Sequence, residues 1–183
     1  MSSIIDTIRD KLPSALLEIG LQGCSAEELI SISRSQQVSC LPSVYQDLML
    51  LMGRRGIDWI LDADATIQSL TADLKQAVFA EFRWMSMAYP QDIFIFEDHE
   101  ASTVAFFRTR DCEDDPAVFS NWEAGCFRKM ADSLSGYVLR MTEQLQESEQ
   151  ERMKSSQEWS REILHLVYRY DPEQDEFVLI PEI

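Results

Sequence analysis

Four consecutive polar residues at positions 97–100, with the sequence EDHE, are the first place in this chain where side chains could do chemistry. Carboxylates and the imidazole of His99 are groups that bind metal ions. Adjacent residues of a hairpin alternate in direction, so all four side chains cannot face one ion without a special turn. We therefore expect a solvated hairpin loop at these positions, with no bound metal and no cofactor.

Covalent catalysis has little support in the sequence. His99 and His165 are the two histidines, and no nucleophile motif flanks either of them. A catalytic triad needs a nucleophile, a base and an orienting acid that converge in space. Gly53 and Gly56 follow an expected helix, whereas phosphate-binding glycines usually follow a strand. The sequence predicts that this protein is not an enzyme.

The four cysteines, at positions 24, 40, 112 and 126, indicate neither a zinc site nor a redox motif. None of them forms a C-x-x-C pair, and histidines are too few for a zinc site of the usual kind. The opening segment carries charges among its apolar positions, unlike a secretory signal, and no apolar run approaches the length of a membrane span. We expect reduced thiols and a cytoplasmic protein.

A second acidic group, in the sequence DCEDDP, is a better candidate for function. It is typical of a solvated turn that ends at Pro116. It could equally present negative charge to a basic partner, with an aromatic anchor from the next hairpin inside an acidic rim. The residues support both interpretations, and for Trp122 they favour the core. The candidate partner-binding residues are Asp111, Glu113, Asp114, Asp115, Trp122 and Glu123.

The charge of the chain narrows the choice of partner. Its 183 residues include 16 basic and 32 acidic side chains, which gives a formal net charge of -16. Such a balance disfavours nucleic acid and anionic membranes, and it attracts basic proteins at long range. An acidic protein with no specific electrostatic role is the alternative. The apolar fraction of 45% is that of a globular chain, and the length suits one domain with an extension.

Helical patterns dominate the first half of the chain. Ser25 and Glu28 form a capping box, which predicts a helix to about residue 36 with Leu29 and Ile30 inward. Pro42 opens a second helix, whose apolar stripe includes Leu48. Three further segments are expected: a helix over residues 3–19 that Pro13 interrupts, a short strand at 57–61 with the sequence IDWIL, and a helix over 66–87.

Strand patterns follow. Two continuous apolar runs, at 93–96 and 103–107, predict central strands that are buried on both faces. A second hairpin is expected over residues 117–130, and a helix over 131–145. Residues 146–157 are almost free of apolar side chains and predict a solvated helix or a linker. The last segment shows a weak hairpin signal around Asp171-Pro172.

This order of elements resembles the SUKH superfamily, the Smi–Knr type proteins. Three stretches carry the resemblance, over roughly residues 24–143. They are SAEELISISRSQQVSCLPSVYQDLMLLMG with its Leu-Pro helix, DIFIFEDHEASTVAFFRTRDCEDDPAVFSNWEAG with its turn histidine and Asp-Asp-Pro loop, and KMADSLSGYVLRM, which is similar to the closing helix. No single stretch is diagnostic, and their order carries the resemblance.

The resemblance implies an α+β fold, with helices packed against a mixed, mainly antiparallel sheet. We expect a SUKH-like domain over residues 1–145 and an extension over 146–183. Bacterial members resemble immunity proteins that neutralise toxins without catalysis. We therefore expect a non-catalytic binding protein, with a basic polymorphic toxin as its partner. A regulatory or scaffold module with an endogenous partner is the alternative, and the sequence names no oligomeric state.

Overall fold

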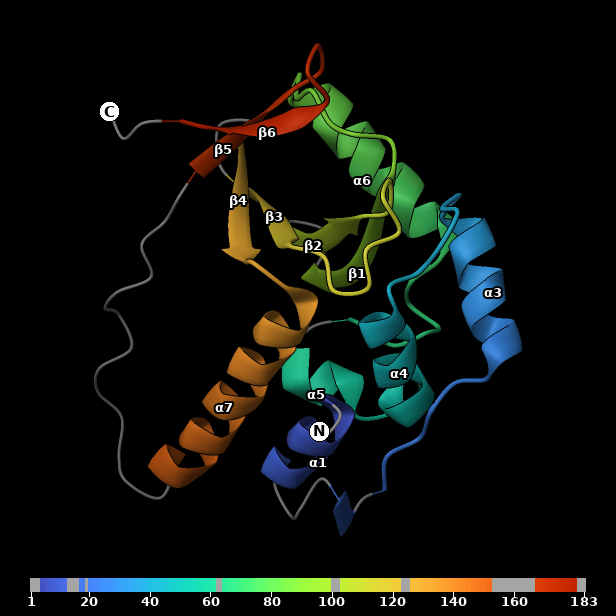
Figure 1. Ribbon diagram of the computed structural model, residues 1–183, viewed down its shortest axis with the longest axis vertical. Coiled ribbons are helices and arrows are strands. Elements are labelled where there is room, and N and C mark those ends of the chain that lie inside the picture. The colour runs from blue at the N-terminus through green and yellow to red at the C-terminus, as the bar shows by residue number, and fades with distance from the viewer. Residues whose placement is uncertain are drawn as a thin grey trace.

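The computed structural model describes residues 4–12, 17–18, 20–61, 64–99, 103–122, 126–152 and 167–180 (Figure 1). A group of helices precedes the strands of one sheet, and a further helix lies between the fourth and fifth strands, which confirms the predicted α+β class. The elements are α1 (Ile4–Lys11), α3 (Ala26–Ser35), α4 (Ser43–Met52), α5 (Ile57–Leu61), α6 (Ala72–Trp84), β1 (Ile93–His99), β2 (Thr103–Arg108), β3 (Val118–Trp122), β4 (Cys126–Ala131), α7 (Leu134–Arg152), β5 (Val167–Asp171) and β6 (Glu176–Leu179).

Within the described residues the sheet has six strands in the order β1-β2-β3-β4-β5-β6, and each of these pairings is antiparallel. Alternate residues of β1 and β2 enter two different apolar cores. Phe94 and Phe107 pack with α1, α3, α4, α5 and α7, whereas Ile95 and Phe106 pack with α6. In Figure 1 most of the helices lie below the sheet, and α6 lies above it with the β5–β6 hairpin. The prediction that both faces are buried is confirmed.

The predicted helices before the sheet are present, but they differ in detail: the helix expected over 66–87 is α6, which begins at Ala72 and ends at Trp84. Ser25 and Glu28 form the capping box at the start of α3. Leu29 is buried there as predicted. Ile30 was also expected to point inward, but it is half exposed, and Ile32 is buried in its place. In α4, Leu48 is buried as predicted, and Pro42 occupies the position before the first helical residue.

The short strand predicted at residues 57–61 is wrong, because this segment is helix α5. Its buried side chains are Ile57, Ile60 and Leu61, at the i, i+3, i+4 spacing of a helix face. Five apolar residues are too few for the two periodicities to be told apart from sequence. Burial against α4 and α7, which the local pattern does not contain, decides the conformation.

The predicted boundary after Leu145 falls inside a helix, because α7 continues to Arg152. The C-terminal hairpin is part of the same sheet: Phe127 of β4 lies opposite Tyr168 of β5. Phe177 of β6 packs on Phe106, Phe119 and Phe127 with ring centroids 4.2–6.2 Å apart. The hairpin therefore curls over the face of the strands that precede it and joins the core on the α6 side.

β1 was predicted to be central, but it is the first strand of the sheet, and other groups close its outer edge. The Gln36 amide donates to the Ile95 carbonyl at 2.8 Å and accepts from the Ile95 N–H at 2.9 Å. The Lys75 ammonium donates to the Ile93 carbonyl at 2.6 Å. Asp64 and Asp98 exchange two backbone hydrogen bonds, of 3.0 and 3.1 Å. This edge therefore offers few free groups for pairing with another strand.

Candidate functional site

The acidic loop, residues 109–117, connects β2 to β3 and contains four of the six predicted partner-binding residues. The side chains of Asp111, Glu113 and Asp114 are exposed. Their carboxylates form no hydrogen bond among the described contacts, apart from a loose ion pair of 3.9 Å between Asp111 and Arg110. Three negative charges are thus held at the surface within four consecutive residues.

The start of the acidic loop is tied to the strand beside it. The backbone N–H of Thr109 donates to the carbonyl of Asp92 at 2.9 Å, and its hydroxyl donates to the same oxygen at 2.8 Å. Thr109 is itself buried. These two bonds hold the loop where it leaves the sheet.

Asp115 holds the other end of the loop, and it differs from the other three predicted acids because its carboxylate has partners within the protein. One carboxylate oxygen accepts from the Ser135 N–H at 2.8 Å, and the other accepts from the Ser135 hydroxyl at 2.5 Å. Ser135 lies in the first turn of α7, where backbone N–H groups lack partners within the helix. A negative charge at this position is favourable, so Asp115 stabilises the fold.

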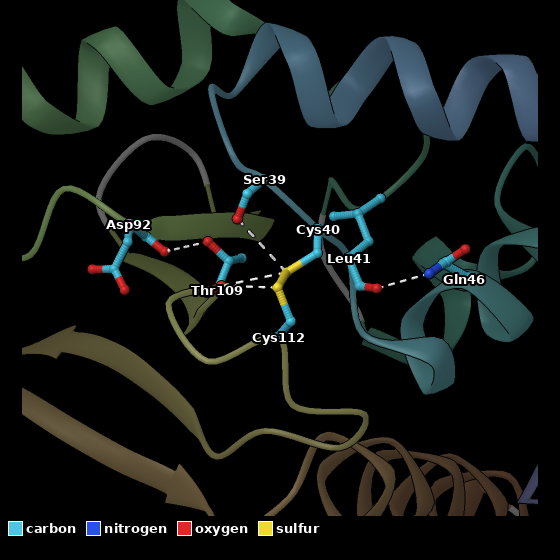
Figure 2. The surroundings of a disulfide bond; sticks show 7 residues. All are labelled: Ser39, Cys40, Leu41, Gln46, Asp92, Thr109 and Cys112. Carbon is cyan, nitrogen blue, oxygen red and sulfur yellow. Dashed lines mark hydrogen bonds between the residues drawn. A yellow bond between two sulfur atoms is a disulfide. The ribbon is translucent and has the colours of Figure 1, made fainter.

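The middle of the acidic loop is fixed by a disulfide bond between Cys40 and Cys112 (Figure 2), and our expectation of reduced thiols is wrong for this pair. The two residues are 72 positions apart, and their Cα atoms lie 5.8 Å from one another. No spacing rule could have indicated the bond, because the fold alone brings the loop before α4 to the loop after β2. Cys112 has a left-handed backbone, with φ of 49°.

A shallow cavity of about 160 Å³ lies beside the acidic loop. The rings of Phe119 and Phe177, stacked 4.2 Å apart, are among its apolar lining. Asp111 and Glu113 lie on its acidic side. An apolar surface beside carboxylates suits a lysine or arginine side chain, whose stem is apolar and whose head is charged.

Arg108 also lines this cavity, but partners within the protein balance its charge. Its guanidinium donates to both carboxylate oxygens of Asp92, at 2.9 and 3.1 Å, and to Asp175 at 2.6 and 2.9 Å. Burial disfavours the charge, but Asp92 and Asp175 together raise the pKa of Arg108. The cluster joins the β5–β6 turn to β2. Because the charge of Arg108 is balanced, the carboxylates of the acidic loop determine the electrostatic potential at the cavity.

The structure does not bring Trp122 to the acidic loop. Trp122 pairs with Cys126 at the far end of β3. The loop enters the same strand at Val118, about 13 Å away at roughly 3.3 Å per residue. Glu123 lies outside the described residues. Of the six predicted residues, the structure shows Asp111, Glu113 and Asp114 together as exposed acids of one loop.

Sequence reasoning missed a buried polar cluster around Glu97. β1 continues through this residue to His99, so the solvated loop predicted at 97–100 is wrong for its first three positions. Glu97 is buried, with 1% of the residue exposed. Its carboxylate accepts from the Tyr137 hydroxyl at 2.9 and 3.1 Å and lies 2.5 Å from Nε2 of His99. Burial is the main cause that raises the pKa of Tyr137. A bulge between Ile95 and Glu97 breaks the alternation on which the prediction relied.

This cluster joins β1 to α7, and its hydrogen bonds are of the kind that a buried carboxylate requires. Within the described ranges, no three histidine, cysteine, aspartate or glutamate side chains are placed to hold a metal ion. The same ranges contain no helix that is long and apolar enough to cross a membrane.

Comparisons of this chain with protein-family models, with curated proteins and with solved structures found no match.

Proposed function

We propose that this protein is a non-catalytic binding protein that recognises a basic protein partner through Asp111, Glu113 and Asp114. The observation that carries this proposal is their placement: three exposed carboxylates on a loop held at both ends and in the middle. A surface that is ordered before binding loses less conformational entropy when a partner docks. A long basic side chain of the partner would lay its stem on the rings of Phe119 and Phe177.

The resemblance to SUKH proteins gives this binding a biological role. We propose that the protein is an immunity protein that neutralises a bacterial polymorphic toxin and has no enzymatic activity of its own. The net charge of -16 supports a basic protein, rather than nucleic acid or an anionic membrane, as the binding partner. A cytoplasmic location is part of the same proposal, and it would make the Cys40–Cys112 bond a reversible one, because cytosolic thiols are kept reduced.

An immunity protein is usually encoded beside its toxin, so the test is to measure association of the protein with the product of the neighbouring gene at several salt concentrations. The triple variant Asp111→Asn/Glu113→Gln/Asp114→Asn should associate more slowly than the parent, and the difference should shrink as salt rises. A matched control, Asp10→Asn/Asp73→Asn/Glu81→Gln, changes the net charge equally at exposed sites on α1 and α6. It should retain most of the parent's association rate.

Equal slowing in both variants would mean that only the total charge matters, and the acidic loop would lose its assigned role. Binding of an endogenous protein in place of the neighbouring gene product would favour the regulatory alternative.

A further inference from the structure

The two ends of the acidic loop are held by contacts that do not involve the disulfide. Thr109 is hydrogen-bonded to Asp92, and Asp115 is hydrogen-bonded to Ser135. Between these anchors, the described contacts from elsewhere in the chain reach residues 111–114 at two places. They are the disulfide at Cys112 and a 3.3 Å bond from the Val44 N–H to the Asp114 carbonyl.

We propose that the Cys40–Cys112 disulfide is a redox-controlled latch on the binding loop. In the oxidised protein it fixes Asp111, Glu113 and Asp114, and a dithiol reductant releases these residues while the fold stays intact. The consequence for binding rests on the function proposed above, whereas the latch itself can be tested without any partner.

The latch lies outside both apolar cores, which is why its opening spares the fold. Neither Cys40 nor Cys112 belongs to the residues that pack on the two faces of the sheet. Cys112 is exposed and Cys40 is half-buried, so a reductant can reach the bond. Figure 2 shows the bond between two loops, with Ser39 and Thr109 beside it. The Cys40 sulfur lies 3.4 Å from the Thr109 carbonyl, which can accept a hydrogen bond from the reduced thiol.

The position of Cys112 couples the bond to the proposed binding surface. Its chain neighbours on either side, Asp111 and Glu113, both line the cavity beside the loop. The left-handed φ of Cys112 is uncommon for a residue other than glycine, asparagine or aspartate. Once the bond opens, the loop is free to leave this conformation, and both carboxylates move with it.

The chemistry is thiol–disulfide exchange with a dithiol. One thiolate of the reductant attacks the exposed sulfur of Cys112, and the Cys40 thiolate leaves. The second thiolate of the reductant then displaces the Cys112 sulfur and closes a disulfide within the reductant. Two electrons pass to the protein, and the two protons lost by the dithiol are balanced by those taken up at Cys40 and Cys112.

Thiol labelling gives the first test of the latch. The chain has four cysteines, of which the disulfide uses two, so alkylation without reductant should label Cys24 and Cys126 alone once the protein is denatured. After treatment with dithiothreitol under native conditions, Cys40 and Cys112 should be labelled as well. Labelling of all four in protein purified without reductant would overturn the proposal.

Amide hydrogen exchange then shows what the latch holds. On reduction, the Val44 and Cys112 amides should lose protection, because their bonds to Asp114 and Thr109 depend on the loop's position. The Thr109 and Ser135 amides should keep theirs, since their acceptors lie at the loop anchors. The double variant Cys40→Ser/Cys112→Ser should show the reduced pattern with or without dithiothreitol.

Unchanged protection at Val44 and Cys112 would overturn the latch, and loss of protection throughout the sheet would show that the bond holds the fold instead.

Binding is then compared between oxidised and reduced protein, with the neighbouring gene product as the probe. Weaker binding after reduction is expected, and equal binding by a released loop would overturn the regulatory role. Should neither form bind, the proposed function fails, while the exchange data still decide the latch.

Discussion

The outer edge of β1 and the acidic loop are both polar, but they use their polar groups in opposite ways. At the β1 edge, Gln36 and Lys75 are buried, and the hydrogen bonds of their side chains go to groups of the protein itself. In the acidic loop, Asp111, Glu113 and Asp114 are exposed, and their carboxylates are left to solvent and partners.

The difference follows from the cost of burial. A polar group taken out of water must find a partner inside the protein, so buried polar residues are committed to the fold. An exposed charge keeps its hydration and remains available to an incoming surface. The acidic loop contains acids of both kinds. Asp115 is hydrogen-bonded to the first turn of a helix, whereas Asp111, Glu113 and Asp114 are exposed.

Among the variants that test this difference, the largest change in the free energy of unfolding is expected at Gln36. The variant Gln36→Leu keeps the volume but removes both bonds to Ile95, which leaves a buried N–H and a buried carbonyl without partners. At roughly 1–3 kcal/mol for each unsatisfied group, unfolding should become easier by about 2–6 kcal/mol. Denaturant unfolding measures this loss.

Gln76→Leu, at an exposed position of α6, is the control and should change stability little. A midpoint for Gln36→Leu equal to that of the control would show that water replaces the lost bonds and that the β1 edge is open.

A pH-dependent effect is expected at Lys75. Burial lowers the pKa of Lys75 to about 8, and Asp92 opposes this. Between pH 8 and the ordinary pKa of 10.5, the unfolded chain therefore binds more protons at this group than the folded chain does. The contribution of Lys75 to stability should rise with pH across this window and be flat below it.

The measurement is the free energy of unfolding against pH for the parent and for Lys75→Met. Other groups titrate in the same range, and their contributions cancel when the two curves are subtracted. A difference that stays constant from pH 8 to 10.5 would show that hydrogen bonds to the Gln36 and Ile93 carbonyls keep the ammonium charged.

The smallest effects are expected within the acidic loop. Asp115→Ala removes a charged acceptor from the first turn of α7 and should lower the free energy of unfolding by roughly 1–2 kcal/mol. The triple variant Asp111→Asn/Glu113→Gln/Asp114→Asn should stay within about 0.5 kcal/mol of the parent. Thermal unfolding of both variants would sharpen the division between structural and available acids, and a larger loss in the triple variant would contradict it.

Several features of the fold could be predicted because they rest on short-range patterns. The capping box of Ser25 and Glu28 depends on two residues three positions apart, and the burial of Leu48 follows from helical spacing in α4. The continuous apolar runs of β1 and β2 predicted strands that are buried on both faces of the sheet. The weak signal at Asp171-Pro172 marked a true turn between β5 and β6.

The candidate site was only partly predictable. Composition indicated the acidic loop, but it could not separate Asp115 from the other acids, because the separation depends on Ser135, twenty residues further along the chain. The alternative that Trp122 lies beside the loop is disfavoured by the length of β3, which separates Trp122 from the end of the strand where the loop enters. The burial of Glu97 required knowledge of a bulge, which has no signature in a single sequence.

The sequence by itself determined the class of fold, the capped start of α3 and the strong negative charge, since periodicity, capping and composition are local or additive properties. The tertiary structure alone decided which helices close the β1 edge, that residues 57–61 coil into α5, and that Cys40 meets Cys112. Each of these features depends on contacts between groups that are distant in the sequence. Such groups become neighbours only when the apolar faces of the helices and the sheet are buried together, and no local sequence pattern predicts these contacts.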